Sequence, residues 1–170
     1  MRPAALRVLM VEDSANAAAL LLCELAKIRR PIVHERVKDE CGLIAALDMH
    51  PWDVVICNWT MPTFSALGAL AALEKRRLDV PFIVVAGTED EAAAVECMRA
   101  GAHDYVLEDR LARLVPALER ELRQSGRRKE YRKREARFQA LIERSAEAIS
   151  LTDAEGTLTY LSPGVPYPPR

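Results

Sequence analysis

Five short apolar runs alternate with helix-forming segments along most of the chain, and this alternation limits the possible folds more than any other feature. The runs cover residues 6–11, 32–37, 53–57, 82–86 and 105–107. Near-continuous apolar runs are typical of strands buried on both faces, as in parallel sheets whose strands are joined by helices. We therefore predict an α/β domain with a five-stranded parallel sheet that helices cover on both sides.

Helix signals lie between the runs at the expected places. The first predicted helix covers residues 15–28 and is closed by Arg29, Arg30 and Pro31. Asp39 can cap the second helix, and Gly101 stands where the fourth, predicted over 89–100, should end. A fifth helix is predicted to begin at Leu111.

Composition excludes several classes of protein. Half of the 170 residues are apolar, which is enough for a core without disulfides or a structural metal. The four cysteines are far apart and form no CxxC pair, so we expect buried thiols rather than a zinc or redox site. A net charge of −1 gives no general attraction to nucleic acid or anionic membranes. No apolar run approaches the ~20 residues of a membrane helix or resembles a signal peptide, so we expect a cytoplasmic protein.

The residues that follow the strands are the candidate site, because ligands of such sheets bind beyond the carboxyl ends of the strands. Here these residues are Glu12 and Asp13 after the first strand, Asn58 after the third, Ala86 at the end of the fourth and Glu108 after the fifth.

Four motifs at these positions carry a resemblance to a known family. The acidic pair, DVVICNWTMP (53–62), FIVVAG (82–87) and AGAHDYVLED (100–109) occur in order. Together they resemble the receiver domain of two-component response regulators, over residues 5–123. The resemblance implies a doubly wound, flavodoxin-like sheet with strand order 2-1-3-4-5. It also implies a site that binds Mg²⁺ and in which an aspartate accepts a phosphoryl group.

The chain departs from that family pattern at three positions. Asn58 replaces the acceptor aspartate, and an amide cannot form an acyl phosphate. Ala86 replaces the hydroxyl residue that hydrogen-bonds the phosphoryl group, and Glu108 replaces the lysine that neutralises it. We therefore predict a degenerate pseudo-receiver with no catalytic residue and no enzymatic activity.

The resemblance also implies metal ligands. Glu12, Asp13 and the backbone carbonyl of Thr60 correspond to the Mg²⁺ site of the family. Without the aspartate at position 58 we expect a weak Mg²⁺ site at most. In the alternative interpretation, Glu12 and Asp13 are solvated or cap the first helix.

Tyr105 matches an aromatic that moves inward in active receivers together with the hydroxyl residue. Because Ala86 cannot trigger that movement, we expect Tyr105 to be a fixed aromatic at the surface or in an interface. The three histidines, His34, His50 and His103, share no spacing that indicates a metal or catalytic site.

The chain changes character after residue 123. Residues 124–146 are predicted to be a linker helix, with a break at Gly126 left open. From Arg127 to Arg137 seven basic and two acidic residues give an excess of +5. A solvated helix with internal Glu–Arg pairs is the favoured interpretation, and nucleic-acid binding is the alternative.

The last segment resembles the opening of a PAS domain from Phe138 onward. We predict a truncated hairpin within 147–162, turning at residues 153–156, and a loose proline-rich tail over 163–170.

The favoured function is a receiver-like signalling module that acts through protein–protein contacts. The partner is another signalling protein or a second copy, bound through the fourth helix, fifth strand and fifth helix or through the linker helix. The alternative keeps Mg²⁺-dependent phosphorylation, with another residue as acceptor.

Overall fold

The computed structural model describes residues 4–87, 91–143 and 150–161. The chain divides into two compact units, Met1–Ser125 and Gly126–Arg170.

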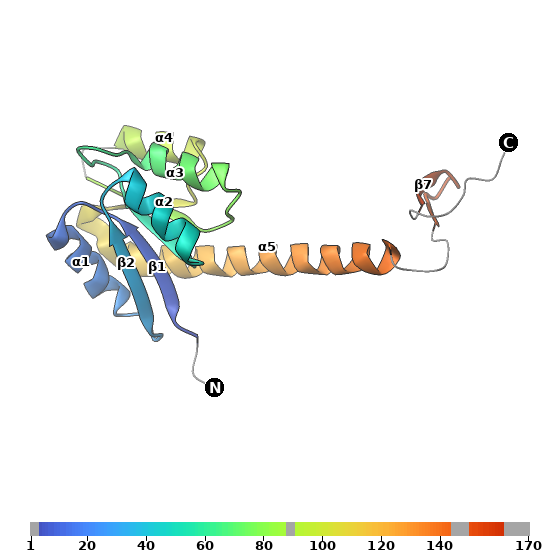
Figure 1. Cartoon of the computed structure of the whole chain (residues 1–170), viewed down its shortest axis with the longest axis horizontal. Helices are drawn as coiled ribbons and strands as arrows, with labels where there is room; N and C mark the ends of the chain where they lie inside the picture. Colours follow the sequence, from blue (N-terminus) through green and yellow to red (C-terminus); the bar gives the residue numbers. More distant parts are fainter. Residues whose placement is uncertain (1–3, 88–90, 144–149, 162–170) are drawn as a thin grey trace. The chain divides into compact units, whose positions relative to one another are not determined.

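The first unit is a doubly wound α/β fold around one parallel sheet (Figure 1). Its strands follow the order β2-β1-β3-β4-β5 and all neighbouring pairs are parallel. The predicted fold class and strand order are therefore confirmed. The elements are β1 (Leu6–Val11), α1 (Ala15–Leu25), β2 (Ile32–Val37), α2 (Glu40–Met49), β3 (Val54–Asn58), α3 (Ala66–Lys75), β4 (Phe82–Ala86), α4 (Glu91–Arg99), β5 (Asp104–Leu107), the 3-10 helix η1 (Glu108–Arg113) and the start of α5 (Leu114–Glu143).

Two apolar clusters cover the two faces of the sheet. Helices α2, α3 and α4 lie on one face, where Phe82, Leu43 and Leu70 belong to one buried cluster. Helix α1 and the first turns of α5 lie on the other face, where Leu25 and Leu118 are fully buried. Successive strand residues alternate between the clusters, as the period of a β-strand requires. The apolar strands are thus buried on both sides.

Side-chain caps begin three of the helices. The Ser14 hydroxyl accepts a hydrogen bond from the Ala17 N–H, and Asp39 accepts one from the Gly42 N–H, as predicted for the second helix. Ser65 does the same for α3 through the Gly68 N–H. These bonds satisfy donors that have no partner inside the helix. Gly101 follows α4 with a φ of 103°, which confirms the predicted turn.

Two predicted helix boundaries were wrong. α1 ends at Leu25 rather than residue 28, because i→i+3 bonds to Lys27 and Ile28 tighten the chain as it turns toward β2. Pro31 contributes, since the residue before a proline disfavours helical geometry. The fifth helix does not begin at Leu111: η1 comes first, and Arg110 breaks the helical geometry (φ −127°, ψ 35°).

The second unit contains the rest of α5 and a hairpin. The helix continues through Gly126 to Glu143, so the break left open at that glycine does not occur. β6 (Ser150–Thr152) and β7 (Leu158–Leu161) pair antiparallel, and Asp153 closes their turn by accepting from the Glu155 and Thr157 N–H groups. Residues 147–149 and the predicted tail 163–170 lie outside the described residues. Among the described helices, none is both long and apolar enough to cross a membrane.

Candidate functional site at the carboxyl edge of the sheet

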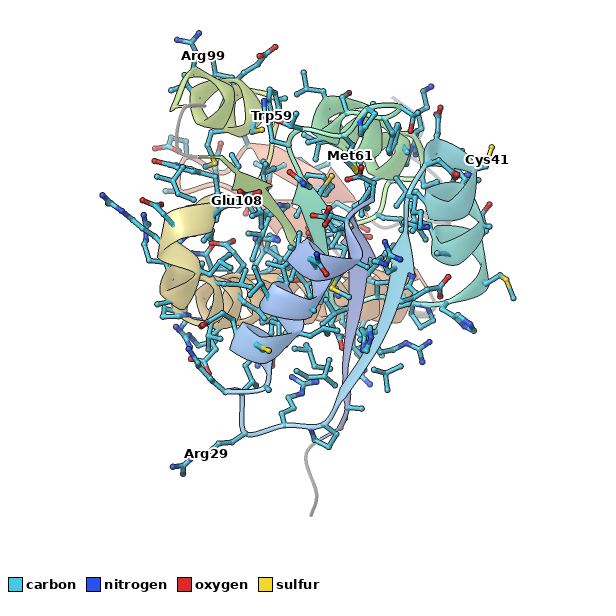
Figure 2. All side chains as sticks on the ribbon, turned by 90° about the vertical axis from the view of Figure 1, so that its left-hand side faces the viewer. Arg29, Cys41, Trp59, Met61, Arg99 and Glu108 are labelled. Atoms are coloured by element: carbon cyan, nitrogen blue, oxygen red, sulfur yellow. The ribbon has the colours of Figure 1, made fainter. Side chains whose placement is uncertain are left out.

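Strand register brings the predicted site residues to one edge of the sheet. Val11 on β1 is level with Cys57 on β3, so the next residues, Glu12 and Asn58, are neighbours. Asn58 is level with Val85 on β4, and Ala86 is level with Leu107 on β5. Trp59, Met61 and Glu108, which follow these strand ends, are labelled at this edge in Figure 2.

Glu12 is a buried carboxylate, with 2% of its surface exposed. Its carboxylate accepts a hydrogen bond of 2.9 Å from the Ser14 N–H. Burial raises the pKa of Glu12, the Ser14 N–H and the Asn58 side chain lower it, and the adjacent Asp13 carboxylate raises it again. The net effect is a raised pKa.

The Asn58 side chain lies at the end of β3, beside Glu12 at the end of β1. Its Oδ1 accepts the Thr60 N–H at 3.2 Å, and its side chain lowers the pKa of Glu12. An amide at this position adds no negative charge beside Glu12 and Asp13, whereas an ionised carboxylate would.

The residues present do not fit a dedicated magnesium site. Mg²⁺ demands near-octahedral oxygen coordination. Here the Glu12 carboxylate already accepts the Ser14 N–H, and the Asn58 oxygen faces the Thr60 N–H. In the part of the chain that the structure describes, no three His, Cys, Asp or Glu side chains are grouped to hold a metal. The weak site at Glu12, Asp13 and the Thr60 carbonyl stays a prediction.

Arg36 is a residue of this site that the sequence reasoning missed. Its Nη1 donates to the carbonyl oxygens of Glu12 (3.1 Å) and Asp13 (3.0 Å). It lies on β2, level with Met10 of β1, one residue before the end of its strand. The sequence offered one signal for it. Arg36 is a basic residue near the end of a strand predicted to neighbour the acidic loop, Glu12 and Asp13. The guanidinium fixes the backbone of the acidic loop through charge-assisted hydrogen bonds.

The β4–β5 half of the edge has a different character. Ala86 is fully buried and offers a methyl group where a hydroxyl would be needed to hold an anion. Glu108 is exposed and begins η1. This half of the edge thus presents an apolar surface and a negative charge.

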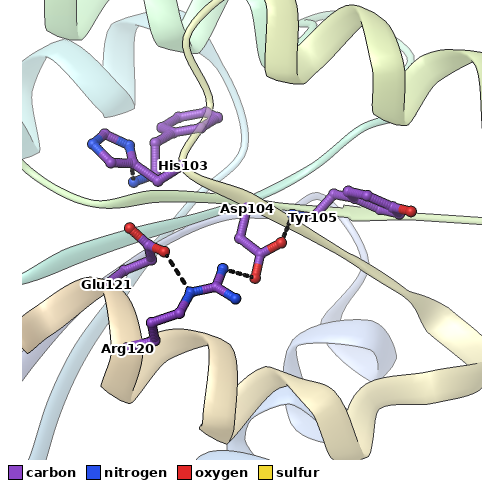
Figure 3. A network of polar contacts seen from close by, with 6 residues as sticks. His103, Asp104, Tyr105, Arg120 and Glu121 are labelled. Carbon is purple, nitrogen blue, oxygen red and sulfur yellow. Dashed lines mark hydrogen bonds and ion pairs between the residues drawn. The ribbon is translucent and has the colours of Figure 1, made fainter. Parts of the chain in front are cut away.

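Tyr105 lies half-buried on β5 and packs against the cluster beneath α2–α4, together with Trp59, Met61 and Phe64. In Figure 3 its ring points away from the polar network on the other side of β5. The prediction of a fixed aromatic at the surface or in an interface is not tested by this packing.

The network beside Tyr105 joins β5 to α5. Arg120 donates to Asp104 at 2.7 Å and to Glu121 at 2.9 Å, while Asp104 also accepts the Tyr105 N–H at 2.8 Å (Figure 3). Asp104 and Glu121 are buried, with 7% and 3% exposed. Buried carboxylates need such partners, so Arg120 has a structural role here.

The histidines and cysteines show no reactive arrangement. His34 and His50 are exposed, and the Nδ1 of His103 accepts the Phe82 N–H at 3.1 Å, a structural contact. The expectation of buried thiols was right for Cys57 and Cys97 but wrong for Cys23 and Cys41, which are exposed. Burial raises the pKa of Cys97 to about 11 and that of Cys57 well above its ordinary value. Both buried thiols are therefore protonated at neutral pH and are poor nucleophiles.

Residues 8–119 match the family of response regulator receiver domains. Among known proteins, the regulatory protein AtoC of Escherichia coli (strain K12) is 30% identical over 101 residues, which are 59% of this chain and 22% of that protein. The transcriptional regulatory protein KdpE of Mycobacterium tuberculosis is 36% identical over 84 residues, 46% of this chain and 37% of that protein. The chain thus spans well under half the length of either regulator.

Shorter proteins and solved domains are matched over nearly their whole length. The chemotaxis protein CheY of Thermotoga maritima is 26% identical over 113 residues, 66% of this chain and 93% of CheY. The structure of FixJ-N is 25% identical, with a TM-score of 0.61, and covers 72% of this chain and 96% of its own. The receiver domain of a LuxO repressor protein from Vibrio parahaemolyticus has a TM-score of 0.65 at 21% identity, over 77% of this chain and 98% of its own.

Proposed function

The chain belongs to the response regulator receiver domain family, and we propose that it is a pseudo-receiver of two-component signalling that acts through protein–protein contacts. One observation carries the proposal: an amide, Asn58, stands at the position that resembles the phosphorylation site, beside the buried Glu12 and bonded to the Thr60 N–H. We expect no enzymatic activity of the chain itself, and a cytoplasmic location stays a prediction from the sequence.

The chemistry of the edge supports this proposal. An amide nitrogen or oxygen is not a nucleophile that can form an acyl phosphate. The buried Ala86 supplies no hydrogen-bond donor to a phosphoryl oxygen, and the Glu108 carboxylate would repel one. The alternative, phosphorylation of another residue, would fall to Thr60 or to Thr88, which lies outside the described residues. The hydroxyl of either residue is a weaker nucleophile than a carboxylate at neutral pH.

The face formed by α4, β5 and the start of α5 is the proposed contact surface. On α4, Val95 and Met98 are 52% and 43% exposed although both are apolar. On the neighbouring β5, Tyr105 is half-buried. An apolar centre with an aromatic and a polar rim is typical of protein interfaces. We propose that another signalling protein or a second copy covers this face.

The second unit offers a further contact. Tyr131, Phe138 and Leu141 are 69%, 58% and 72% exposed, and their spacing of seven and three residues places them along one side of α5. We propose that this stripe pairs with a second copy. Nucleic-acid binding by residues 127–137 is less favoured, because acidic residues interrupt the basic stretch and Glu130 pairs with Arg134 at 2.7 Å. The hairpin of β6 and β7 supports the proposal that a PAS-like segment begins here.

Phosphorylation is tested by incubating the full chain with acetyl phosphate and Mg²⁺ and measuring its intact mass. We expect no adduct of about 80 Da, because the acceptor carboxylate is missing. The matched control is the triple variant Asn58→Asp, Ala86→Thr, Glu108→Lys, which restores the three missing groups and should gain the adduct. A stoichiometric adduct on the wild-type chain would disprove the proposal.

The two proposed contact surfaces are separated by light scattering of full-length variants. Met98→Glu places a charge on the α4 face, and Phe138→Glu places one in the stripe of the second unit. Both side chains are exposed, so neither change should unfold the protein. If one variant no longer self-associates, its substituted residue identifies the surface at which two copies meet. If the wild-type chain is monomeric, only the contact with another signalling protein remains proposed.

A further inference from the structure

A small pocket opens beside the site, between α1 and the start of η1. Its volume is about 150 Å³. A cavity of about this size is enough for a molecule as large as benzene. The residues that line it come from three elements and one loop: Glu12, Ala17, Leu20, Leu21, Val85, Glu108 and Leu111.

The walls of the pocket are mainly apolar. Ala17, Leu20 and Leu21 are spaced three and four residues apart, so α1 presents one helix face to the cavity. Leu21 and Val85 belong to the buried core, whereas Leu20 is 59% exposed. Such walls suit a short alkyl chain, because water among them would find few hydrogen-bond partners.

The two polar side chains at the pocket are both carboxylates. Glu12 is buried and fixed by the Ser14 N–H, so it cannot turn out to solvent without losing that bond. Glu108 is exposed and lies on the η1 side. Among the described residues that line the cavity, two are negatively charged and none is basic.

We propose that this pocket binds an alkylammonium group, with the alkyl chain against α1 and Leu111 and the ammonium between Glu12 and Glu108. An ammonium donates three hydrogen bonds and carries the charge that the pocket lacks. The same group is available from a free aliphatic amine and from the lysine side chain of a partner. The site does not depend on whether the chain is phosphorylated.

The test is an NMR titration of the isotope-labelled full chain with n-butylammonium chloride. We expect saturable shifts of the amide signals of Ala17, Leu20 and Leu111. 1-Butanol has a chain of the same length without the charge, and sodium chloride matches the ionic strength. Equal affinity for butanol, or no shift at these residues with butylammonium, would overturn the proposal.

Two variants locate the site. Glu108→Gln should weaken butylammonium binding about tenfold, the loss that ~1.4 kcal/mol corresponds to. Its matched control, Asp109→Asn, removes the neighbouring exposed charge outside the pocket and should leave the affinity unchanged. Ala17→Leu should block binding by filling the cavity while both carboxylates stay in place. Unchanged affinity in both Glu108→Gln and Ala17→Leu would contradict the assignment.

A second ligand distinguishes a free aliphatic amine from the lysine side chain of a partner as the source of the ammonium group. Nα-acetyl-lysine methylamide carries the same ammonium on a peptide-like backbone. Binding of both compounds supports a site that also accepts a partner's lysine side chain. Binding of butylammonium alone supports a site for free amines. If neither compound binds, the proposal of an alkylammonium site is rejected.

Discussion

The two halves of the carboxyl edge differ in their polar contacts. At the β1–β3 half, Glu12 accepts the Ser14 N–H, Asn58 accepts the Thr60 N–H, and Arg36 donates to the carbonyls of Glu12 and Asp13. At the β4–β5 half, Ala86 presents only a methyl group and Glu108 an exposed carboxylate. Removing a partner from a buried polar group costs about 1–3 kcal/mol, whereas a change at an exposed position such as Glu108 costs little. The two halves should therefore respond differently to substitution.

The largest effect is expected from Asn58→Asp. A third carboxylate would replace the neutral amide beside Glu12 and add like-charge repulsion, so we expect a loss of about 2–3 kcal/mol in unfolding free energy without metal. Millimolar Mg²⁺ should recover most of this loss, because the added carboxylate is a metal ligand. Urea unfolding with EDTA and with Mg²⁺ measures both. Asn16→Asp, the same change at an exposed position in α1, is the control and should stay within ~0.5 kcal/mol. Equal stability of wild type and Asn58→Asp in EDTA would show that the amide bonds contribute nothing.

The next effect is expected from Arg36→Ala. Losing two charge-assisted bonds to the carbonyls of Glu12 and Asp13 should lower the unfolding free energy by about 1–2 kcal/mol. The control is Arg29→Ala, since Arg29 is exposed and projects away from the fold in Figure 2. Denaturant unfolding of both variants gives the difference. If Arg36→Ala matches Arg29→Ala, the network of the β1–β3 half does not include Arg36.

A pH profile tests the buried carboxylate. Because the folded-state pKa of Glu12 is raised, the folded chain binds this proton more tightly than the unfolded chain. The contribution of Glu12 to stability should therefore decrease as pH rises from about 4.3, the ordinary glutamate value, through the folded pKa. Glu12→Gln should flatten that part of the thermal stability profile.

The control for the profile has the opposite sign. Arg76 lowers the pKa of the exposed Asp48, so its contribution is present above the unfolded pKa and is lost as pH falls. Asp48→Asn should remove the part of the stability loss at acid pH that comes from protonation of Asp48. It should leave the shape of the profile near neutral pH unchanged. A Glu12→Gln profile parallel to that of wild type would contradict the raised pKa.

The smallest effect is expected at the other half of the edge. Glu108→Lys should change the unfolding free energy by no more than ~0.5 kcal/mol, because Glu108 is exposed. A smaller loss of unfolding free energy in Glu108→Lys than in Arg36→Ala would show that the two halves of the edge differ. A loss above ~1 kcal/mol would mean that Glu108 belongs to the structural network.

Much of the architecture was predictable because each signal is local. Apolar runs marked the strands, Asp39 marked a cap and Gly101 a left-handed turn, and parallel strands place their carboxyl ends at one edge. The same signals predicted that Glu12, Asn58, Ala86 and Glu108 lie at one edge of the sheet, but they did not identify Arg36. The boundaries of α1 and η1 were not, because the last turns depend on how the chain enters the next element.

The contacts that give the site its character depended on the tertiary structure. Nothing local to Asn58 shows that its amide reaches Glu12 on another strand, and nothing local to Arg36 shows which carbonyls it meets. The exposure of Cys23 and Cys41 depends likewise on which helix faces pack against the sheet.

The sequence by itself determined the fold and the identity of the residues at each strand end, including the asparagine at position 58, since these follow from residue type and period. Only the tertiary structure decided that Asn58 lies beside the buried Glu12, and that a pocket is lined by both Glu12 and Glu108. The physical reason is that hydrogen bonds and cavities form between residues distant in the chain. Their geometry is set by packing, which residue order alone does not specify.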